Sequence, residues 1–181
     1  TIPDEWHIYW QNPGDSGMPT TLKWTLPAGV EAGAIQWPAP ERQPMDTLVN
    51  YGYSHEVVLP VPLSIRNDGV AGDITVKADW LVCRDICIPE SAVLTGTLPS
   101  ENGKAAIEKA RAQAPVPFPG KAAYAATKEQ VQLTLTPSGD WEMPDKVDLM
   151  PLDDGILRNS AEPTLTRGDG SFTLSVQRGN A

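Results

Sequence analysis

The chain contains two cysteines, Cys83 and Cys87, separated by Arg84, Asp85 and Ile86. Two closely spaced thiols suit reversible exchange, because one thiolate attacks a partner's disulfide and the second resolves the mixed disulfide. The spacing leaves two other uses open. One is a local structural disulfide. The other is a pair of metal ligands, because soft sulfur ligands suit Cu(I).

The residues around the pair are typical of a strand, and this places a geometric condition on any disulfide. Residues four apart in a straight strand lie about 13 Å apart, whereas a disulfide needs Cα atoms within about 7 Å. A bond between Cys83 and Cys87 therefore requires the three intervening residues to turn the chain. The strand-like flanks favour a tight hairpin over one helical turn, and Asp85 suits such a turn.

A purely structural role explains this spacing poorly. In the loop-closure picture a disulfide contributes about 2 kcal/mol for so short a loop, against about 3 kcal/mol for 15 residues. The neighbouring charges oppose each other, because Arg84 favours a nearby thiolate and Asp85 disfavours it. A metal site would need a third ligand from a His or Met, which no motif identifies. Reversible exchange is therefore the leading hypothesis, with a local staple and a metal pair as alternatives.

Composition argues against two classes of partner. The 181 residues carry 14 Lys and Arg against 23 Asp and Glu, a formal net charge of −9. No basic surface is available to displace counterions from a nucleic acid, and the same acidity argues against direct binding to an anionic membrane surface. No apolar run approaches the ~18 residues of a membrane helix. Because the chain begins at Thr1 without Met, we expect a processed protein or a piece of a longer one.

Residues 1–99 are typical of an antiparallel β-sandwich, and the 18 Pro and 15 Gly of the chain favour short strands joined by turns. Residues 5–10 alternate, with Trp and Ile at the even positions and His7 and Tyr9 on the opposite face. This pattern predicts that His7 is half-exposed, and His55 is expected to be solvated. Further strands are predicted at residues 21–26, 57–63, 74–82 and 92–98, with turns at 12–15, 67–69 and 89–90.

The rest of the chain is predicted to hold a helix, a linker and a second small β module. Residues 101–114 are rich in Ala, and Ser100 can cap a helix there. The Pro-rich run 115–120 ends this helix and forms a stiff linker. Strands are predicted at residues 131–136, 146–150 and 171–177, with a hairpin turn at Asp169-Gly170.

We therefore expect three parts in the chain. Residues 1–99 form the first β domain, and residues 100–119 form the helix and linker. Residues 120–181 form the second β module. They are few for a complete sandwich of about 100 residues, so this module is minimal, truncated or completed by strands of the first domain.

One motif resembles a protease nucleophile but lacks its partners. Gly14-Asp15-Ser16-Gly17 is similar to the nucleophile segment of trypsin-like proteases, where the Ser needs a His base held by a carboxylate. Neither His7 nor His55 lies in a matching context, so a Gly-rich turn is the simpler interpretation. The six Trp residues are interpreted mostly as core filling, and Asp153-Asp154 as a solvated turn.

The residues around the cysteines resemble a known family. The run from Trp80 to Glu90 is similar to the cysteine motif of the periplasmic N-terminal domain of the DsbD and ScsB thiol:disulfide reductases. The resemblance covers most of residues 5–99 and is closer to ScsB, the suppressor of copper sensitivity protein B. Residues 155–160 and 170–179 resemble the second extracytoplasmic module of ScsB more weakly. Other similar motifs occur in the family's order: His7-Ile8-Tyr9-Trp10, Pro13-Gly14-Asp15-Ser16-Gly17, Trp37-Pro38-Ala39-Pro40-Glu41-Arg42 and Gly52-Tyr53.

This resemblance implies an immunoglobulin-like antiparallel sandwich that carries electrons in the periplasm. Electrons would come from a transmembrane reductase domain of the same parent polypeptide. They would pass to thioredoxin-like or other disulfide-bearing acceptor proteins, and no dissociable cofactor is needed. In the family the C-terminal cysteine of the pair makes the attack. Cys87 is therefore expected to be the nucleophile and Cys83 the resolving sulfur.

The resemblance also implies a cap over the cysteines. Residues 46–53 are the expected counterpart of the DsbD cap loop, with Tyr51 or Tyr53 as the shielding ring. Supporting roles near the pair are expected for Trp80, Arg84 and Asp85. The chain departs from DsbD in having only three residues between the cysteines and in lacking the DsbD cap sequence. The alternative is a binding module, either a sulfur-based copper protein linked to copper tolerance or a sandwich whose disulfide is purely structural.

Overall fold

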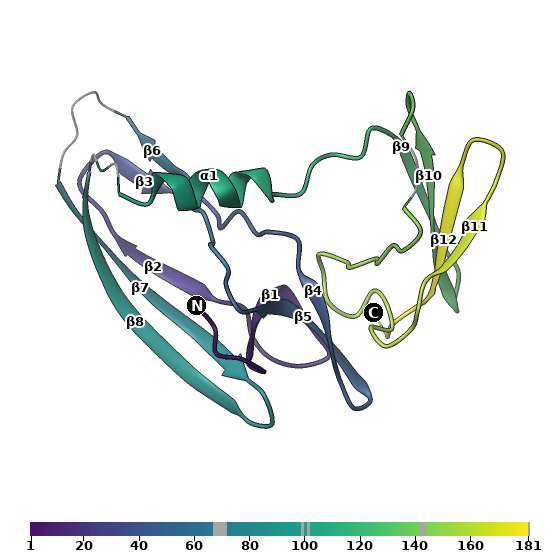
Figure 1. The fold of residues 1–181 in the computed structure, drawn as a ribbon, viewed down its shortest axis with the longest axis horizontal. Coiled ribbons are helices and arrows are strands. Elements are labelled where there is room, and N and C mark those ends of the chain that lie inside the picture. Colours follow the sequence, from purple (N-terminus) through teal and green to yellow (C-terminus); the bar gives the residue numbers. More distant parts are fainter. Residues whose placement is uncertain (67–71, 99, 101, 142–143, 181) are drawn as a thin grey trace. The chain divides into compact units, whose positions relative to one another are not determined.

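The computed structural model describes residues 1–66, 72–98, 100, 102–141 and 144–180. These residues are mainly β, in antiparallel sheets, with one helix in the part of the chain that is described (Figure 1). The mainly β fold expected from the sequence is confirmed. In chain order the elements are β1 (His7–Gly14), β2 (Thr21–Thr25), β3 (Val30–Ala32), β4 (Glu41–Met45), β5 (Leu48–Ser54), β6 (Leu63–Ile65), β7 (Gly72–Cys83), β8 (Cys87–Leu98), α1 (Lys104–Ala112), β9 (Gly120–Ala126), β10 (Gln130–Pro137), β11 (Thr164–Arg167) and β12 (Phe172–Gln177).

The chain divides into two compact units, each built from several segments. Unit 1 contains Thr1–Pro13, Gly17–Gln43 and Tyr51–Pro115, and unit 2 contains Gly14–Ser16, Pro44–Asn50 and Val116–Ala181. Two short pieces from the first half of the chain therefore belong to the unit that the second half builds. The division of the chain at residues 99 and 119 remains a prediction.

Strand β7 organises the largest sheet, whose order is β2-β7-β1-β5-β4, with β8 also paired to β7. Residues 75–79 of β7 pair with β2 and residues 82–83 pair with β1, while β8 pairs with β7 from residue 72 to residue 83. All three pairings are antiparallel. Strands β2 and β1 thus follow each other along one edge of β7, and β8 runs along the other edge (Figure 1). This arrangement brings β1 beside the end of β7 that carries Cys83.

The sequence of β7 alternates as a half-buried strand requires. Val76 and Trp80 lie on its apolar face, which lines a cavity of about 460 Å³ together with residues 57–61. Lys77 and Asp79 lie on the other face, where Nζ and Oδ1 are 2.8 Å apart. The predicted strands 21–26, 74–82 and 92–98 correspond to β2, β7 and β8.

Residues 57–63 were expected to form a strand, and this prediction was wrong for all but the last residue, where β6 begins. Pro60 and Pro62 have no N–H to donate to a neighbouring strand, so the segment cannot form a regular ladder. Their carbonyl groups accept hydrogen bonds from the N–H groups of Gln36 and Gly33, both at 2.8 Å. The predicted turn at 67–69 lies outside the described residues.

Residues 46–53 were expected to form a loop, but most of them belong to strand β5. Strands β4 and β5 are neighbours in the sheet, and Asp46-Thr47 is the turn between them. Asp46 has φ 55°, a left-handed conformation that Asp tolerates in turns. Regular strand pairing therefore holds the segment for which we predicted a cap.

The helix exists but is shorter than the predicted range 101–114. It begins at Lys104 because Gly103, with φ 78° in the left-handed region, is the residue at its N-cap. Ser100 does not cap it, and its hydroxyl accepts a hydrogen bond from the Asn102 N–H instead. Glu101 lies outside the described residues. The Pro-rich run that follows the helix carries no regular structure before β9.

Unit 2 contains an antiparallel sheet of order β11-β12-β10-β9. Leu174 and Val176 of the central strand β12 are buried in its core. Trp141 packs edge-to-face against Phe118 and Phe172, with ring centroids 5.0 and 6.2 Å away. These rings supply apolar area that the short strands alone would lack.

The sequence located some elements of unit 2 and missed others. The strands predicted at 131–136 and 171–177 are confirmed as β10 and β12. The turn at Asp169-Gly170 is also confirmed, because β11 and β12 pair across it and Gly168 N–H donates to the Ser171 carbonyl at 2.8 Å. Residues 146–150 form no strand, so that prediction was wrong. Strands β9 and β11 had not been predicted.

Among the helices of the described residues, none combines the length and the apolar character that crossing a membrane requires.

Candidate redox site at the tip of the β7–β8 hairpin

The two cysteines form a disulfide across the end of the β7–β8 hairpin. They are direct partners in the strand register, and their Cα atoms are 4.2 Å apart. The three residues between them make the turn, in which the Arg84 N–H donates to the Ile86 carbonyl at 3.1 Å. The hairpin predicted from the cysteine spacing is therefore confirmed.

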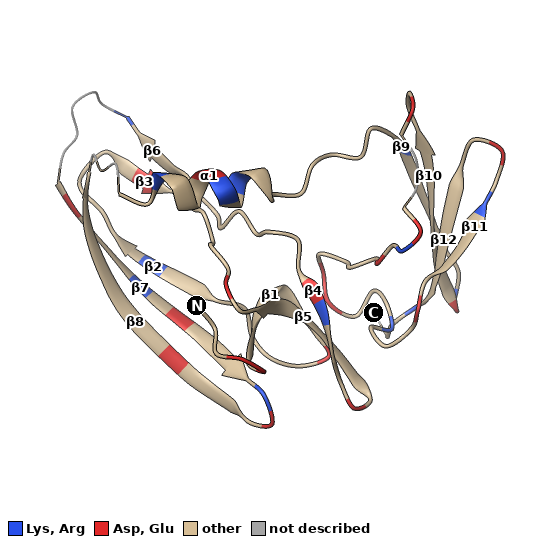
Figure 2. Cartoon of the chain, viewed as in Figure 1, with Lys and Arg blue, Asp and Glu red and all other residues tan. Residues whose placement is uncertain are grey.

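The two sulfurs have very different access to solvent. Cys83 is 0% exposed, because β1 and β8 flank it on both sides. Cys87 is exposed, and so are its neighbours Ile86 and Ile88. A reagent that approaches the hairpin tip therefore reaches Cys87 before Cys83. The turn at the tip also contains a basic and an acidic residue, Arg84 and Asp85, and the ribbon there is blue and red in Figure 2.

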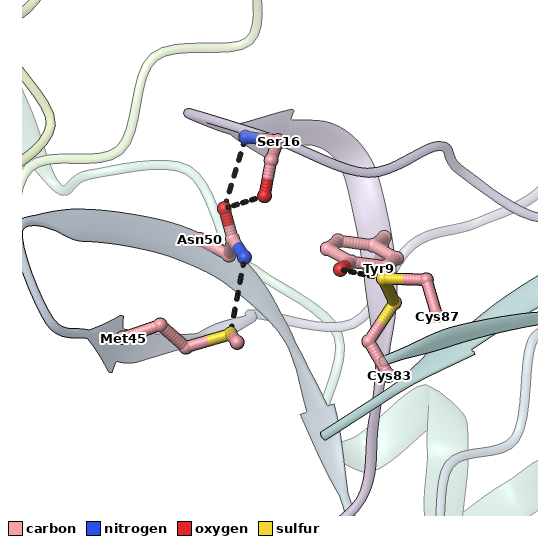
Figure 3. Close-up of a disulfide and its surroundings, with 6 residues drawn as sticks. All are labelled: Tyr9, Ser16, Met45, Asn50, Cys83 and Cys87. Atoms are coloured by element: carbon pink, nitrogen blue, oxygen red, sulfur yellow. Dashed lines mark hydrogen bonds between the residues drawn. A yellow bond between two sulfur atoms is a disulfide. The ribbon is translucent and has the colours of Figure 1, made fainter. Parts of the chain in front are cut away.

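Tyr9 of β1 contacts the disulfide. Its hydroxyl lies 3.7 Å from Cys87 Sγ, and the residue is only 1% exposed (Figure 3). Gly17 makes room for this ring, because a Cβ at Gly17 would lie 2.2 Å from Tyr9 Cε1. The Gly after Ser16 in the protease-like motif is thus explained by packing on Tyr9. The sequence analysis placed Tyr9 on a strand face but assigned it no role.

His7 lies beside the disulfide and is 5% exposed, so the prediction that it is half-exposed was wrong. The alternating pattern puts His7 on the strand face opposite Ile8 and Trp10, and we expected that face to be open to solvent. In the structure His7 and Tyr9 on that face are both buried. His7 is the register partner of Cys83, and its ring packs edge-to-face on Tyr9 with centroids 5.1 Å apart. Burial lowers the pKa of His7 below its usual value of 6.5.

Charged and aromatic side chains surround the hairpin tip. Arg84 Nε is 2.9 Å from Asp85 Oδ2, and Arg84 Nη1 is 3.3 Å from Glu5 Oε2. The guanidinium also lies over the Trp6 ring, 5.6 Å from its centroid. These contacts are exposed, and exposed ion pairs contribute about 0–1 kcal/mol each. They connect the turn to Glu5 and Trp6, the two residues that precede β1.

Trp80 lies on β7 three residues before Cys83, where it is the register partner of Glu90. Its indole N–H donates to Glu90 Oε2 at 3.1 Å. Trp80 and Glu90 also line a groove of about 350 Å³ with Met18 and Pro89. The supporting role expected for Trp80 at the cysteine pair remains a prediction.

The two tyrosines expected to shield the cysteines lie in β5. The Tyr51 ring packs edge-to-face on Trp10, with centroids 6.4 Å apart. The Tyr53 hydroxyl donates to the Pro38 carbonyl at 2.9 Å, and burial raises its pKa. Both rings are buried. Their role as a shield remains a prediction.

The protease-like motif supplies turn contacts in unit 2. The N–H and hydroxyl of Ser16 both donate to Oδ1 of buried Asn50, at 3.0 and 3.1 Å (Figure 3). The Asn50 amide in turn donates to Met45 Sδ at 3.7 Å. These contacts hold the Ser16 hydroxyl in the turn, as the simpler interpretation of the motif expected.

A metal site was one of the alternatives for the cysteine pair. The described residues contain no group of three or more His, Cys, Asp or Glu side chains placed to hold a metal ion.

Comparisons with known proteins agree with this geometry. The family model of the thiol:disulfide interchange protein DsbD, N-terminal, matches residues 1–99. The fold is similar to the crystal structure of the N-terminal periplasmic domain of ScsB from Proteus mirabilis, with a TM-score of 0.69 and 22% sequence identity. That match covers 98% of this chain and 71% of the ScsB chain. A search of curated protein sequences gave no match.

The family match spans more than half of the chain. The first domain therefore has the immunoglobulin-like fold that the sequence predicted. The chain belongs to the family of the N-terminal domain of the thiol:disulfide interchange protein DsbD.

Proposed function

We propose that this chain is a thiol–disulfide exchange domain in which Cys87 exchanges with partner proteins and Cys83 is the internal resolving sulfur. The observation that carries the proposal is the unequal exposure of one disulfide, with Cys83 0% exposed and Cys87 exposed. A disulfide that only holds the fold gains nothing from presenting one sulfur to solvent. An exchanging disulfide needs one accessible sulfur and one protected sulfur.

The reaction follows from this asymmetry. In the reduced domain the Cys87 thiolate attacks one sulfur of an acceptor's disulfide, forming a mixed disulfide and releasing the acceptor's other sulfur as a thiolate. Cys83 then loses its proton and attacks Cys87 Sγ. This attack re-forms the Cys83–Cys87 bond and releases the acceptor's second thiolate. Two electrons pass to the acceptor, which binds two protons in total.

The partners belong to the same proposal. The family is named for the N-terminal part of an interchange protein, and the ScsB structure is described as a periplasmic domain. These descriptions support a domain that works in the periplasm. It would take electrons from a transmembrane reductase domain of the same polypeptide and pass them to thioredoxin-like or other disulfide-bearing acceptors. The exposed side chains of Ile86 and Ile88, on either side of Cys87 in the sequence, supply apolar contact area there.

Two matched variants test the roles of the sulfurs. The reduced Cys83→Ser protein is expected to accumulate a mixed disulfide at Cys87 with oxidised glutathione, measured by mass spectrometry. The reduced Cys87→Ser protein is expected to react far more slowly, because Cys83 is 0% exposed. Equal rates for the two variants, or faster labelling of Cys83, would contradict the assignment.

The reduction potential tests exchange against a structural disulfide. Structural disulfides usually have potentials below about −300 mV. We expect the Cys83–Cys87 couple to lie above that value, measured by equilibration in glutathione and dithiothreitol buffers. A potential well below it would show that the disulfide serves the fold and not exchange.

A further inference from the structure

His7 lies in a row with the two cysteines. It is the register partner of Cys83 across β1 and β7, and Cys83 is the partner of Cys87 across β7 and β8. Residues directly opposite each other in antiparallel strands point to the same face, with Cβ atoms about 4.5–5.5 Å apart. The His7 and Cys83 side chains therefore lie on the same face of the sheet, as neighbours across β1 and β7.

The imidazole is buried with one nitrogen unused. His7 is 5% exposed, and its Nε2 has no hydrogen-bond partner among the residues described. A buried polar atom without a partner costs about 1–3 kcal/mol, so its presence needs a reason. Burial lowers the pKa of His7, which keeps the ring neutral at neutral pH and leaves one ring nitrogen with a lone pair.

Cys83 has a proton to exchange and no access to water. Its sulfur leaves as a thiolate when the disulfide opens, and it must lose a proton when it closes the bond again. At 0% exposure, solvent cannot carry that proton directly. Burial in apolar surroundings also disfavours the thiolate form. A neighbouring base is therefore needed for a fast resolving step.

We propose that His7 accepts and returns the proton of Cys83, an inference that rests on the proposed exchange function. As Cys83 attacks Cys87 Sγ in the mixed disulfide, the Cys83 proton passes to the imidazole. The Cys83–Cys87 bond forms, the bond between Cys87 and the partner breaks, and the imidazolium gives its proton to the departing thiolate or to water. In the reverse direction the attacking thiol gives its proton to the imidazole, which gives it to Cys83.

The other ionisable groups near His7 are placed for different tasks. Tyr9 packs on the imidazole, and its hydroxyl lies 3.7 Å from Cys87 Sγ. The charged groups at this end of the sheet are exposed and paired with one another. The titratable and charged groups of the surrounding elements are Tyr9 on β1, Tyr51 and Tyr53 on β5, Asp73, Lys77, Asp79 and Cys83 on β7, Cys87 and Glu90 on β8, and Glu5, Arg84 and Asp85 at the tip.

The experiment follows both steps of the reaction with one probe. The reduced protein is mixed with 5,5′-dithiobis(2-nitrobenzoic acid), which releases one coloured thiolate when Cys87 attacks and a second when Cys83 resolves. In His7→Phe we expect the first phase to stay within about twofold of wild type. We expect the second to slow by about tenfold or more, because general-base catalysis typically contributes at least that much. The matched control is His55→Phe, because His55 is the second histidine of the chain and is exposed. This variant is expected to change neither phase.

The pH profile separates proton transfer from packing. The second phase of His7→Phe is expected to be slower than that of wild type, and this difference in rate should shrink between about pH 7 and about pH 9, because hydroxide replaces the missing base. A folded His7→Phe protein whose second phase matches wild type would overturn the role of His7. A difference in second-phase rate that stays the same at every pH would also overturn the role of His7. A wild-type protein that releases only one thiolate would instead overturn the exchange function itself.

Two further measurements cover the case in which His7→Phe does not fold. His7→Gln keeps a polar side chain but supplies no base, so it is expected to show the same slow second phase, and a normal second phase would overturn the proposal. In the wild-type protein, nitrogen NMR shifts of the His7 ring are expected to show a new hydrogen bond on reduction, while those of His55 stay unchanged. A His7 ring that gains no hydrogen bond on reduction would also overturn it.

Discussion

Cys83 and Cys87 share a bond but have different surroundings. Cys83 is enclosed between β1 and β8, next to a neutral imidazole, and Cys87 is exposed beside the hydroxyl of Tyr9. The proposed roles of the two sulfurs, exchange with partners at Cys87 and resolution at Cys83, rest on this difference. Both neighbours belong to β1, since Tyr9 contacts Cys87 and His7 is the register partner of Cys83.

The Tyr9 hydroxyl is expected to favour the Cys87 thiolate in the reduced protein. Hydrogen bonds to charged groups contribute about 1.5 kcal/mol or more, and 1.4 kcal/mol corresponds to a factor of ten. We expect Tyr9→Phe to slow alkylation of Cys87 by iodoacetamide at neutral pH by several-fold, up to about tenfold. The measurement uses the Cys83→Ser background, so that one thiol reacts. The control Tyr124→Phe, at an exposed tyrosine, should alkylate at the parent rate, and an equal rate for Tyr9→Phe would contradict the role of the hydroxyl.

His7 also makes stability depend on pH. Because burial lowers its pKa in the folded protein, the unfolded chain binds this proton more readily. The group therefore has no effect on the free energy of unfolding above the ordinary His pKa of about 6.5, and it reduces that free energy as the pH falls below it. We expect a lower urea midpoint at about pH 5.5 than at about pH 7.5. The drop should be smaller in His7→Phe and unchanged in His55→Phe. An equal drop in wild type and His7→Phe would assign the pH effect to other groups.

The arrangement of strands around β7 is what builds the site. The β7–β8 hairpin brings the sulfurs together, and β1 pairs with the last two residues of β7. That short pairing delivers His7 and Tyr9 to the disulfide. On its other side β1 is neighboured by β5, so the position of β1 depends on how closely β5 packs against it.

Gly52 of β5 permits this close approach. A Cβ there would lie 2.0 Å from the Ile8 carbonyl oxygen, a backbone atom that cannot move without shifting β1. We expect Gly52→Ala to lower the free energy of unfolding by more than about 2 kcal/mol, measured by urea denaturation. The matched control is Gly96→Ala in β8, where a Cβ would make ordinary contacts with Ile74 at 3.6 and 3.8 Å. Its effect should be neutral or slightly stabilising. Equal losses in both variants would show that the close approach is not the cause.

Across the whole molecule, the two units are interleaved in sequence. Unit 2 includes Gly14–Ser16 and Pro44–Asn50, which the chain supplies long before the rest of that unit. Asp15 joins these pieces to the late part of unit 2. Its Oδ2 accepts from the Val49 N–H at 2.7 Å, and its Oδ1 accepts from the Asn159 amide at 2.9 Å. Unit 2 therefore depends on side chains of the segment that the family model covers.

Removal of the Asp15 carboxylate is expected to loosen unit 2. In Asp15→Ala the half-buried N–H of Val49 and the buried amide of Asn159 each lose this acceptor, which costs about 1–3 kcal/mol. Hydrogen exchange should become faster at the Leu174 and Val176 amides of β12. The control is Asp140→Ala, at an exposed carboxylate of the same unit, which should leave these rates unchanged. Unchanged exchange in Asp15→Ala would mean that backbone contacts alone hold the pieces together.

Some features of this protein follow from short-range spacing and could be predicted directly. The distance between residues four apart in a strand requires a turn between Cys83 and Cys87, and the structure contains that turn. Period-2 patterns and turn residues located β7, β10 and β12. Residues 57–63 misled the prediction because their apolar pattern resembles a strand, while Pro60 and Pro62 prevent regular pairing.

The contact between Tyr9 and Cys87 and the burial of His7 depend on which strands pair with each other. Short-range sequence patterns do not contain this information. Tyr9 and Cys87 are 78 positions apart, so their contact comes from the register of β1 against β7 and β8. The burial of His7 has the same origin, because alternation assigns a side chain to a face but does not say what covers that face. The amino-acid order alone was enough to predict that a bond between Cys83 and Cys87 would require a bend between them. The unequal exposure of the two sulfurs and the burial of His7 were decided by long-range strand pairing, because burial is a property of the assembled sheet.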